Sequence, residues 1–196
     1  MTGFETVRTA LERRGFAVTV FETAAEAADY LDGKLDGRTI GMGGSMTVKE
    51  LGLVERLSAH NTFLSHWTGA TAQEAAQAQV YLTSCNGLAE TGEIVNIDGT
   101  GNRVASTFFG HAEVYFVVGI NKLAPDFESA LWRARNIASP RNAQRLGRNT
   151  PCAAKGDKCY DCNSPERICR ALAVLWGPPK GVGRTEVVLV GQELGL

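Results

Sequence analysis

Apolar and polar positions recur along the chain with two periods, which predict helices and strands in turn. Residues 4–16 and 48–57 carry apolar side chains three to four positions apart, the spacing of one helix face. Short apolar runs at 17–21 and 113–119 are typical of buried strands. By the same criteria we expect further helices at 24–31, 70–79, 103–109 and 125–137, and further strands at 39–41, 62–65, 80–84 and 186–191.

The segment 88–98 departs from this alternation, because Thr91-Gly92 lies between two stretches that can pair as a β-hairpin. Ser164-Pro165-Glu166 has the composition of a helix start. Elsewhere strands and helices alternate, which predicts an α/β fold with a largely parallel sheet covered on both faces. The 196 residues, 44% of them hydrophobic, are expected to form a single domain, 1–196, with a metal-binding cysteine loop at 150–170.

The charge balance narrows the classes of partner. Twenty Lys and Arg residues nearly cancel twenty-one Asp and Glu residues, so we expect neither a nucleic acid nor a membrane as partner. The first fifteen residues contain five charged side chains and no continuous apolar stretch, which predicts neither a signal peptide nor a transmembrane helix. We therefore expect a cytoplasmic location, where reducing conditions favour metal binding or redox chemistry over structural disulfides for clustered cysteines.

Four of the five cysteines lie within eighteen residues near the C-terminus, with the spacing C-x6-C-x2-C-x6-C: Cys152, Cys159, Cys162 and Cys169. Thiolates are soft ligands that suit tetrahedral zinc or the corners of a 4Fe-4S cluster. Zinc sites usually use two close pairs, and only the central two cysteines form one, so the spacing favours the cluster, with zinc as the alternative. Unmetallated thiols, or a pair of disulfides formed under stress, remain a third interpretation. Cys85 follows a predicted buried strand and is expected to be a core thiol.

The cysteine spacing is similar to the C-x6-C-x2-C-x5-C loop of DNA glycosylases that carry a 4Fe-4S cluster. The similarity concerns spacing only, because the balanced charge provides no DNA-binding surface to accompany it. Lys155, Lys158, Arg167 and Arg170 lie close by in sequence and would offset the negative charge of four thiolates. Such an environment suits both an electron-carrying and a purely structural metal.

Three segments at predicted strand ends are candidates for binding a ligand. In open α/β sheets, ligands bind beyond the carboxyl ends of the strands. The sequence matches neither a dinucleotide fingerprint nor a Walker loop, so a small carboxylate or phosphate is the expected ligand class. Turn and helix-cap chemistry is the competing interpretation. The candidate residues are Gly43, Gly44, Ser45, Thr47, Asn86, Asp98, Gly99, Thr100, Asn102 and Arg103.

Four side chains are candidates for acid or base catalysis. Glu90, Glu93 and Asp98 lie in or after the predicted hairpin, and burial of one of them would raise its pKa toward that of a general base. His66 follows a predicted strand end, and a packed or surface histidine is the competing interpretation. A basic, amide-rich stretch precedes the cysteine loop and could hold an anion or form a solvated helix face: Arg135, Asn136, Arg141, Asn142 and Arg145.

Taken together, these residues resemble the LUD-domain (lactate utilization) proteins. The resemblance spans nearly the whole chain and rests on long, co-linear segments: GGSMTVKELGL at 43–53, VYLTS at 80–84, GEIVNIDGTGNRVA at 92–105, VVGINKLAPD at 117–126, RNIASPRNAQRL, and TPC…DC…SPERIC. It implies a three-layer α/β/α, Rossmann-like fold similar to ribose-5-phosphate isomerase, glucosamine-6-phosphate deaminase and the CoA-transferases. It implies no established catalytic residue, and the four-cysteine loop is found in only part of the family.

Two functions follow as expectations. The resemblance and the thiolate set together predict a redox protein or subunit, with possible redox partner subunits, involved in oxidising lactate or a similar small hydroxy acid. The strand-end loops alone predict a stand-alone enzyme or sensor for a phosphorylated or carboxylated metabolite, with a metal that only braces the C-terminal loop. Whether the protein is an enzyme is left open by the sequence, and a zinc-bearing nucleic-acid module is disfavoured by the charge balance.

Overall fold

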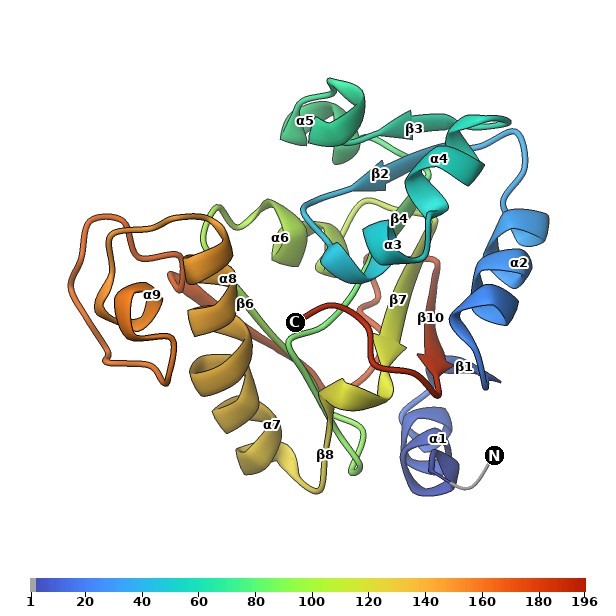
Figure 1. Ribbon diagram of the computed structural model, residues 1–196. Helices are drawn as coiled ribbons and strands as arrows, with labels where there is room; N and C mark the ends of the chain where they lie inside the picture. Colours follow the sequence, from blue (N-terminus) through green and yellow to red (C-terminus); the bar gives the residue numbers. More distant parts are fainter. Residues whose placement is uncertain (1–2) are drawn as a thin grey trace.

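The computed structural model describes residues 3–196, and within them the strands form two sheets (Figure 1). The larger sheet has the strand order β1-β10-β7-β4-β2-β3, and every neighbouring pair is parallel. This arrangement confirms the predicted α/β class with a largely parallel sheet. The strands are β1 (Ala17–Phe21), β2 (Thr39–Met42), β3 (Thr62–Leu64), β4 (Val80–Thr83), β7 (Glu113–Gly119) and β10 (Arg184–Val190).

Both faces of the parallel sheet are buried. Along β7, Tyr115 and Val117 belong to one hydrophobic cluster, while Val114 and Phe116 belong to another on the opposite face. The first face is covered by α2 (Ala24–Lys34), α3 (Met46–Glu50) and α4 (Leu53–Ser58), and the second by α1 (Glu5–Arg13) and the smaller sheet. Because a strand buried on both faces is apolar throughout, the central strands were the easiest to predict.

The smaller sheet has the order β8-β5-β6-β9. Its centre is the predicted hairpin, β5 (Gly87–Ala89) and β6 (Ile94–Asp98), whose strands pair antiparallel. The sequence did not predict that β8 (Leu123–Ala124) and β9 (Ala171–Leu175) extend this hairpin on either side. A small-residue cluster joins this sheet to the following helical run, which consists of α7 (Phe127–Arg133), the π-helical turn η3 (Ala134–Ala138) and α8 (Ser139–Arg145).

The cysteine loop comprises α9 (Pro151–Lys155) and the irregular segment 156–170, and it lies beyond α8 at the left of Figure 1. Its far end is fixed to the turn after β6, where the backbone N–H of Arg170 donates to the carbonyl of Asp98 at 2.9 Å. Gly99 lies so close to Ile168 that an added Cβ would meet its carbonyl oxygen at 2.8 Å. The loop is therefore attached to the smaller sheet.

Several predicted elements differ from the structure. The expected helix 48–57 is interrupted at Gly52, whose φ of +67° ends α3 and starts α4. The helix expected at 70–79 is only α5 (Ala72–Ala75), and the predicted helix start at 164–166 is wrong, since it leads into a turn. The helix expected at 103–109 is confirmed as α6 (Asn102–Phe108). Two short 3₁₀ turns complete the description, η1 (His66–Thr68) and η2 (Ile120–Lys122).

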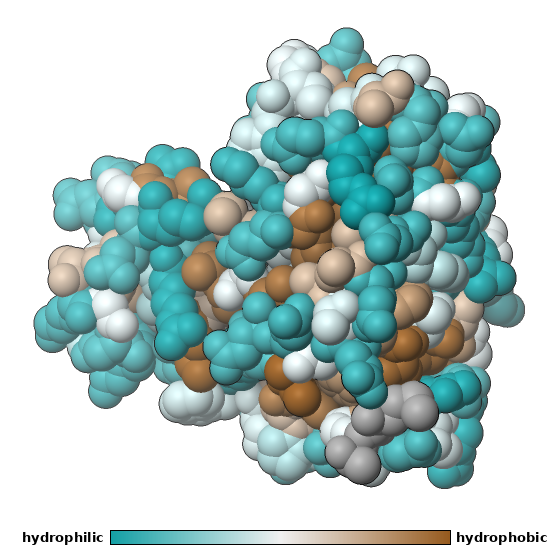
Figure 2. Space-filling view, turned by 45° about the vertical axis from the view of Figure 1, so that its right-hand side comes forward, coloured by the Kyte–Doolittle hydropathy of each residue, from teal (hydrophilic) through white to brown (hydrophobic). Residues whose placement is uncertain are grey.

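The surface of the part that carries the cysteine loop is largely hydrophilic, at the left of Figure 2, whereas apolar side chains gather between it and the larger part. Residues 133–170 contain nine basic and three acidic side chains, against eleven and eighteen in the rest of the chain. The near-neutral total thus conceals a basic region. In the described part of the chain, no helix has the length and apolar character needed to cross a membrane.

Candidate functional site

A small polar cavity lies beyond the carboxyl ends of β2, β4 and β7, and we call it the Lys122 pocket. Three strand-end segments and α8 contribute its walls. It measures about 80 Å³, which is room for a few waters or one small acid and too little for a nucleotide. It is lined by Gly44, Ser45, Met46, Thr47, Ser84, Cys85, Asn86, Ile97, Arg103, Lys122, Ala138, Asn142, Arg145 and Leu196.

Lys122 is the central cation of this pocket. Its side chain comes from η2, directly after β7, and the residue is only 3% exposed. The Nζ atom donates to Thr47 Oγ1 at 2.6 Å and to Ser84 Oγ at 2.8 Å, both of them neutral acceptors. Burial lowers the pKa of Lys122 to about 8, and the neighbouring guanidinium groups add to the effect. The amine is thus desolvated without a carboxylate in contact with it among residues 3–196.

Two guanidinium groups flank Lys122. Half-buried Arg103 on α6 donates to the carbonyls of Ser84 and Ile97, at 3.2 and 2.7 Å, and to the amide oxygens of Asn86 and Asn96. All these acceptors are neutral, so they hold the guanidinium in place without cancelling its charge. Buried Arg133 on α7 similarly donates to the carbonyls of two residues near the pocket, Asn121 at 2.7 Å and Asn86 at 2.6 Å.

The segment 194–196 forms one wall of the pocket. The Thr47 hydroxyl donates to the carbonyl of Leu194 at 3.4 Å, and the N–H of Gly195 donates to the Glu50 carboxylate at 2.6 Å. At Gly195, where φ is +65°, an added Cβ would meet Thr47 Oγ1 at 2.5 Å and Lys122 Nζ at 3.4 Å. This close approach, which only glycine allows, is part of what removes Lys122 from solvent.

The composition of the lining determines what the Lys122 pocket can bind. Arg103, Lys122 and Arg145 contribute positive charge, and the hydroxyls and amides contribute hydrogen bonds. Within the described residues 3–196, no Asp or Glu side chain lines the cavity. A buried excess of positive charge is stabilised by an anion of matching size. The geometry therefore suits a small carboxylate or phosphate.

Half of the predicted ligand-binding residues meet in this pocket: Gly44, Ser45, Thr47, Asn86 and Arg103. The others lie beside it. Asp98 accepts hydrogen bonds from the N–H groups of Thr100 and Gly101 at 3.2 Å and of Val104 at 3.0 Å, so it caps the start of α6, as the competing interpretation held. Gly99, Thr100 and Asn102 belong to the same turn, and Gly43 lies against the hydroxyl of Tyr81.

The acidic candidates for catalysis lie elsewhere. Glu93 forms an ion pair with Arg14, the residue that follows α1, and Glu90 borders a surface depression beside the same helix. His66 is exposed, contacts Trp67 in a tilted arrangement with ring centroids 4.5 Å apart, and lies near Gly44. Of the basic stretch, Asn142 and Arg145 reach the Lys122 pocket. The structure therefore brings cations and amides, but none of the predicted acids, into the lining.

Sequence reasoning missed Lys122 and Arg133. The only available signal for Lys122 was its place three residues after the most strand-like segment of the chain, at a strand end. Cys85 also lines the pocket and is 2% exposed, and burial raises the pKa of its thiol. It remains a protonated thiol at neutral pH, in keeping with the predicted core role.

Arg167 lies beside two of the four loop cysteines, Cys162 and Cys169. Its guanidinium donates to the carbonyl of Cys162 at 2.7 Å and to Cys169 Sγ at 3.5 Å. Arg135 approaches Cys159 Sγ at 3.9 Å, and Cys152 Sγ lies 3.3 Å from the Thr150 hydroxyl that caps α9. All four thiols are free and partly exposed. The guanidinium groups place positive charge where thiolates would need it.

The cysteine geometry fits a metal only in part. Cys159 and Cys169 line the same cavity, which measures about 230 Å³ and includes Arg135 and Arg167 in its wall. Across residues 3–196, no three His, Cys, Asp or Glu side chains approach closely enough to hold a metal ion. The donor set and its guanidinium partners fit an iron-sulfur cluster or zinc, whereas the sulfur positions are more open than a bound site requires. The metal stays a prediction.

Comparisons with known proteins agree with the fold. The family model of the LUD domain matches residues 4–190. A crystal structure of a DUF162 family protein from Deinococcus radiodurans is similar, with a TM-score of 0.57 and 17% sequence identity over 94% of each chain. At that identity the likeness shows the fold alone, a Rossmann-like three-layer arrangement. No protein of curated function matches the chain.

Proposed function

Because the chain belongs to the LUD-domain family, which is associated with lactate utilization, we propose that it binds a small carboxylate and takes part in its oxidation. The ligand is lactate or a similar hydroxy acid, or the 2-oxo acid that its oxidation yields, and it occupies the Lys122 pocket. The protein acts as a redox protein or subunit, and the cysteine loop holds the metal that exchanges electrons with partner subunits.

The observation that carries this proposal is the uncompensated positive charge of a small buried pocket. Lys122 is 3% exposed and contacts hydroxyls, and half-buried Arg103 contacts neutral oxygens. A carboxylate placed between them gains charge-assisted hydrogen bonds in a desolvated site. The volume of about 80 Å³ favours an acid of lactate size over sugar phosphates and coenzyme A esters.

Thermal denaturation with candidate ligands tests the carboxylate site. A ligand at 100 times its dissociation constant stabilises the folded state by about 2.7 kcal/mol. We expect lactate and pyruvate to raise the melting temperature of the wild type, and lactamide, which lacks the charge, to leave it unchanged. Lys122→Met should abolish the effect of both acids. Equal shifts with lactate and lactamide, or no shift with either acid, would contradict the proposal.

The redox half of the proposal rests on the cysteine loop. Cys152, Cys159, Cys162 and Cys169 would hold a 4Fe-4S cluster, or zinc as the alternative, and a bound cluster would supply one-electron transfer. Arg135 and Arg167 already lie beside Cys159 and Cys169. Nine basic side chains against three acidic ones at 133–170 would suit docking of an acidic redox partner.

Metal analysis of anaerobically purified protein tests the redox half. We expect iron and inorganic sulfide in equal amounts, with a broad visible absorption band that dithionite bleaches. The double variant Cys159→Ser/Cys162→Ser should lose both, whereas Cys85→Ser should lose neither. Colourless protein with one bound zinc would exclude electron transfer through the loop.

A stand-alone enzyme or sensor is the second candidate, and one observation favours it. No loop cysteine lines the Lys122 pocket, and two of them, Cys159 and Cys169, border a different cavity. In this alternative the metal only braces the loop, and the ligand is any small phosphorylated or carboxylated metabolite. Turnover of such a metabolite by the double cysteine variant, at wild-type levels, would favour the second candidate over the first.

A further inference from the structure

Lys122 has a chemical property that anion binding alone does not use. A surface lysine or an arginine suffices to attract a carboxylate, and Arg103 and Arg145 already line the pocket. Lys122 instead is almost fully buried, and both hydrogen bonds of its Nζ atom go to hydroxyl groups, those of Thr47 and Ser84. A primary amine held in this way can act as a nucleophile once it is neutral.

The charges that face Lys122 favour its neutral form. Arg103 from α6 and Arg133 from α7 disfavour a third positive charge, as does burial. Glu50 from α3 acts in the opposite direction but more weakly than burial does, and Cys85 after β4 would do so only as a thiolate. With its pKa lowered to about 8, roughly a tenth of Lys122 is neutral at pH 7, about a hundredfold or more above an ordinary lysine.

We propose that Lys122 forms an imine with the carbonyl carbon of a small 2-oxo acid held in the pocket. The inference rests on the proposed carboxylate site and deepens it. The nitrogen lone pair attacks the carbonyl carbon, and the carbon–oxygen double bond is replaced by a carbon–nitrogen double bond. The carbonyl oxygen leaves as water, which carries the two hydrogens that the amine gives up. No oxidant or other reactant is consumed.

The surrounding groups suit both the binding and the chemistry of such an acid. Arg103 and Arg145 remain to balance the carboxylate, while the hydroxyls of Thr47 and Ser84 stand beside the reacting nitrogen and can hydrogen-bond the departing oxygen. A hydroxy acid has no carbonyl at this carbon and can only bind reversibly. The pocket would therefore distinguish the oxidised acid from the reduced one by a covalent bond.

Reductive trapping tests the inference directly. The wild type is incubated with pyruvate and cyanoborohydride, digested and mapped by mass spectrometry. We expect Lys122 to gain the mass of pyruvic acid less one oxygen atom, at least about tenfold more than any other lysine, in line with its larger neutral fraction. Lactate under the same conditions should give no adduct. Even labelling over all lysines, or none at Lys122, would overturn the inference.

Two further measurements separate this inference from the proposed function. Pyruvate that raises the melting temperature without labelling Lys122 leaves the carboxylate site standing and rejects the imine. If pyruvate neither raises the melting temperature nor labels Lys122, the carboxylate site and the imine are both rejected. Because an imine makes the methyl hydrogens of pyruvate acidic, we also expect the wild type to exchange them with deuterated solvent, and Lys122→Arg, which keeps the charge but lacks the amine, to lose the exchange. Should that variant not fold, the peptide map of the wild type still decides.

Discussion

Two buried charges at opposite ends of the parallel sheet differ in how they are compensated. Glu186 lies near the start of β10 and is 0% exposed, with hydrogen bonds from Thr19 and Tyr30 at 2.6 Å, Lys34 at 2.9 Å and Arg184 at 3.0 Å. Lys122 lies beyond the end of β7 and is 3% exposed, and within residues 3–196 the hydrogen bonds of its amine go to two neutral hydroxyls. Lys34 and Arg184 neutralise the charge of Glu186, whereas the charge of Lys122 is left available to a ligand.

The difference separates a structural charge from a functional one. Burial alone would raise the pKa of Glu186, yet its four hydrogen-bond donors lower it to about 2. For Lys122 no such compensation exists within the described residues, and burial lowers the pKa to about 8. A buried charge that is paired with other groups of the protein contributes to stability. A buried charge without such a partner costs stability and is expected at sites where a bound ligand supplies the opposite charge.

The largest effect on stability is expected from a substitution at Glu186. Glu186→Gln removes the charge that Lys34 and Arg184 share, and breaking such a buried pair costs about 3 kcal/mol, at the lower end of the usual range because both cations are partly exposed. Urea denaturation followed by circular dichroism measures the loss. Glu55→Gln, at an exposed position, is the matched control and should change stability by less than about 0.5 kcal/mol.

The same carboxylate predicts how acid affects stability. Because the folded pKa of Glu186 is about 2, below its ordinary value, its contribution is fully present above the unfolded pKa and disappears as the pH falls toward 2. The stability difference between wild type and Glu186→Gln should therefore shrink as the pH drops through this range. A difference that stays constant with pH would mean that Glu186 acts through packing rather than charge.

The next effect concerns Lys122, whose buried charge costs stability instead of contributing to it. Its folded pKa of about 8 lies below the unfolded value of 10.5, so the unfolded chain binds more protons between these values. Stability due to this group must therefore rise with pH from about 8 to 10.5, by about 3 kcal/mol in all. Lys122→Met should remove that rise, which denaturant unfolding at a series of pH values would show.

Lys34 provides the matched control for the predicted rise in stability with pH that Lys122 causes. It is also a partly enclosed lysine, but although burial lowers its pKa, the hydrogen bonds with Tyr30 and Glu186 outweigh burial and raise it. Its contribution is therefore present at neutral pH and lost as the pH rises through the raised value. Lys34→Met should destabilise the protein at neutral pH and leave the rise between about 8 and 10.5 in place. The same slope change in both variants would contradict the comparison.

The sequence predicted the parallel strands, one of which carries Glu186, better than it predicted the burial of Lys122. Strands 113–119 and 186–191 were recognisable because both faces are buried and an uninterrupted apolar run follows the glutamate that opens each segment. The edge strand β9 was missed because only one of its faces is covered, so Leu172 is 54% exposed and the segment adjoins the cysteines. Gly52 interrupts a regular helical period through its backbone conformation, which periodicity does not reveal.

Half of the residues predicted to bind a ligand line the Lys122 pocket, because only part of the site is marked by local sequence. Glycine, serine and asparagine at strand ends mark a loop locally, and three such predictions reached the pocket together with Thr47 and Arg103. The burial of Lys122 depends on segments far apart in the chain, since Thr47, Ser84 and Gly195 all approach its amine. No local pattern encodes that convergence. Asp98, predicted as a ligand-binding or catalytic residue, lies outside the pocket lining, and its carboxylate accepts hydrogen bonds from the N–H groups at the start of α6.

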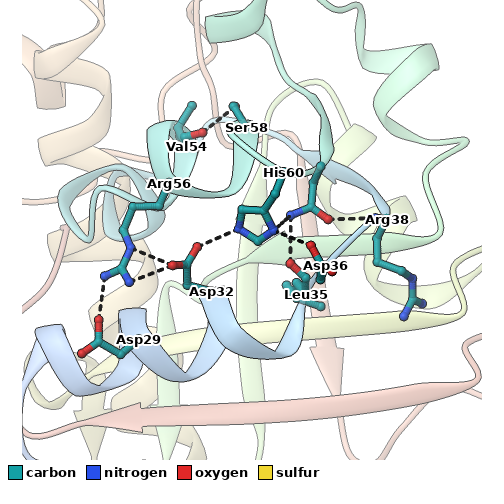
Figure 3. Close-up of polar contacts among 10 residues, drawn as sticks. Asp29, Asp32, Leu35, Asp36, Arg38, Val54, Arg56, Ser58 and His60 are labelled. Carbon is teal, nitrogen blue, oxygen red and sulfur yellow. Dashed lines mark hydrogen bonds and ion pairs between the residues drawn. The ribbon is translucent and has the colours of Figure 1, made fainter.

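The smallest effect is expected at an exposed charge cluster, which tests whether compensation matters without burial. His60 lies between α4 and β3, where its ring nitrogens contact Asp36 at 2.9 Å and Asp32 at 3.0 Å, and Arg56 pairs with Asp29 and Asp32 (Figure 3). The hydrogen bonds with Asp32 and Asp36 raise the pKa of His60. Its contribution to stability is therefore present below the unfolded pKa of about 6.5 and lost as the pH rises through the folded value.

His60→Gln should accordingly lower the melting temperature slightly at mildly acidic pH and not at all at alkaline pH. Water and salt screen an exposed cluster, so we expect a smaller change than at Glu186, and one that high salt removes. Scanning calorimetry of both proteins over this pH range, with and without added salt, measures it. A loss as large as that of Glu186→Gln, or one that persists in salt, would show that the number of partners rather than burial makes a charge structural, and would remove the ground for treating Lys122 as different.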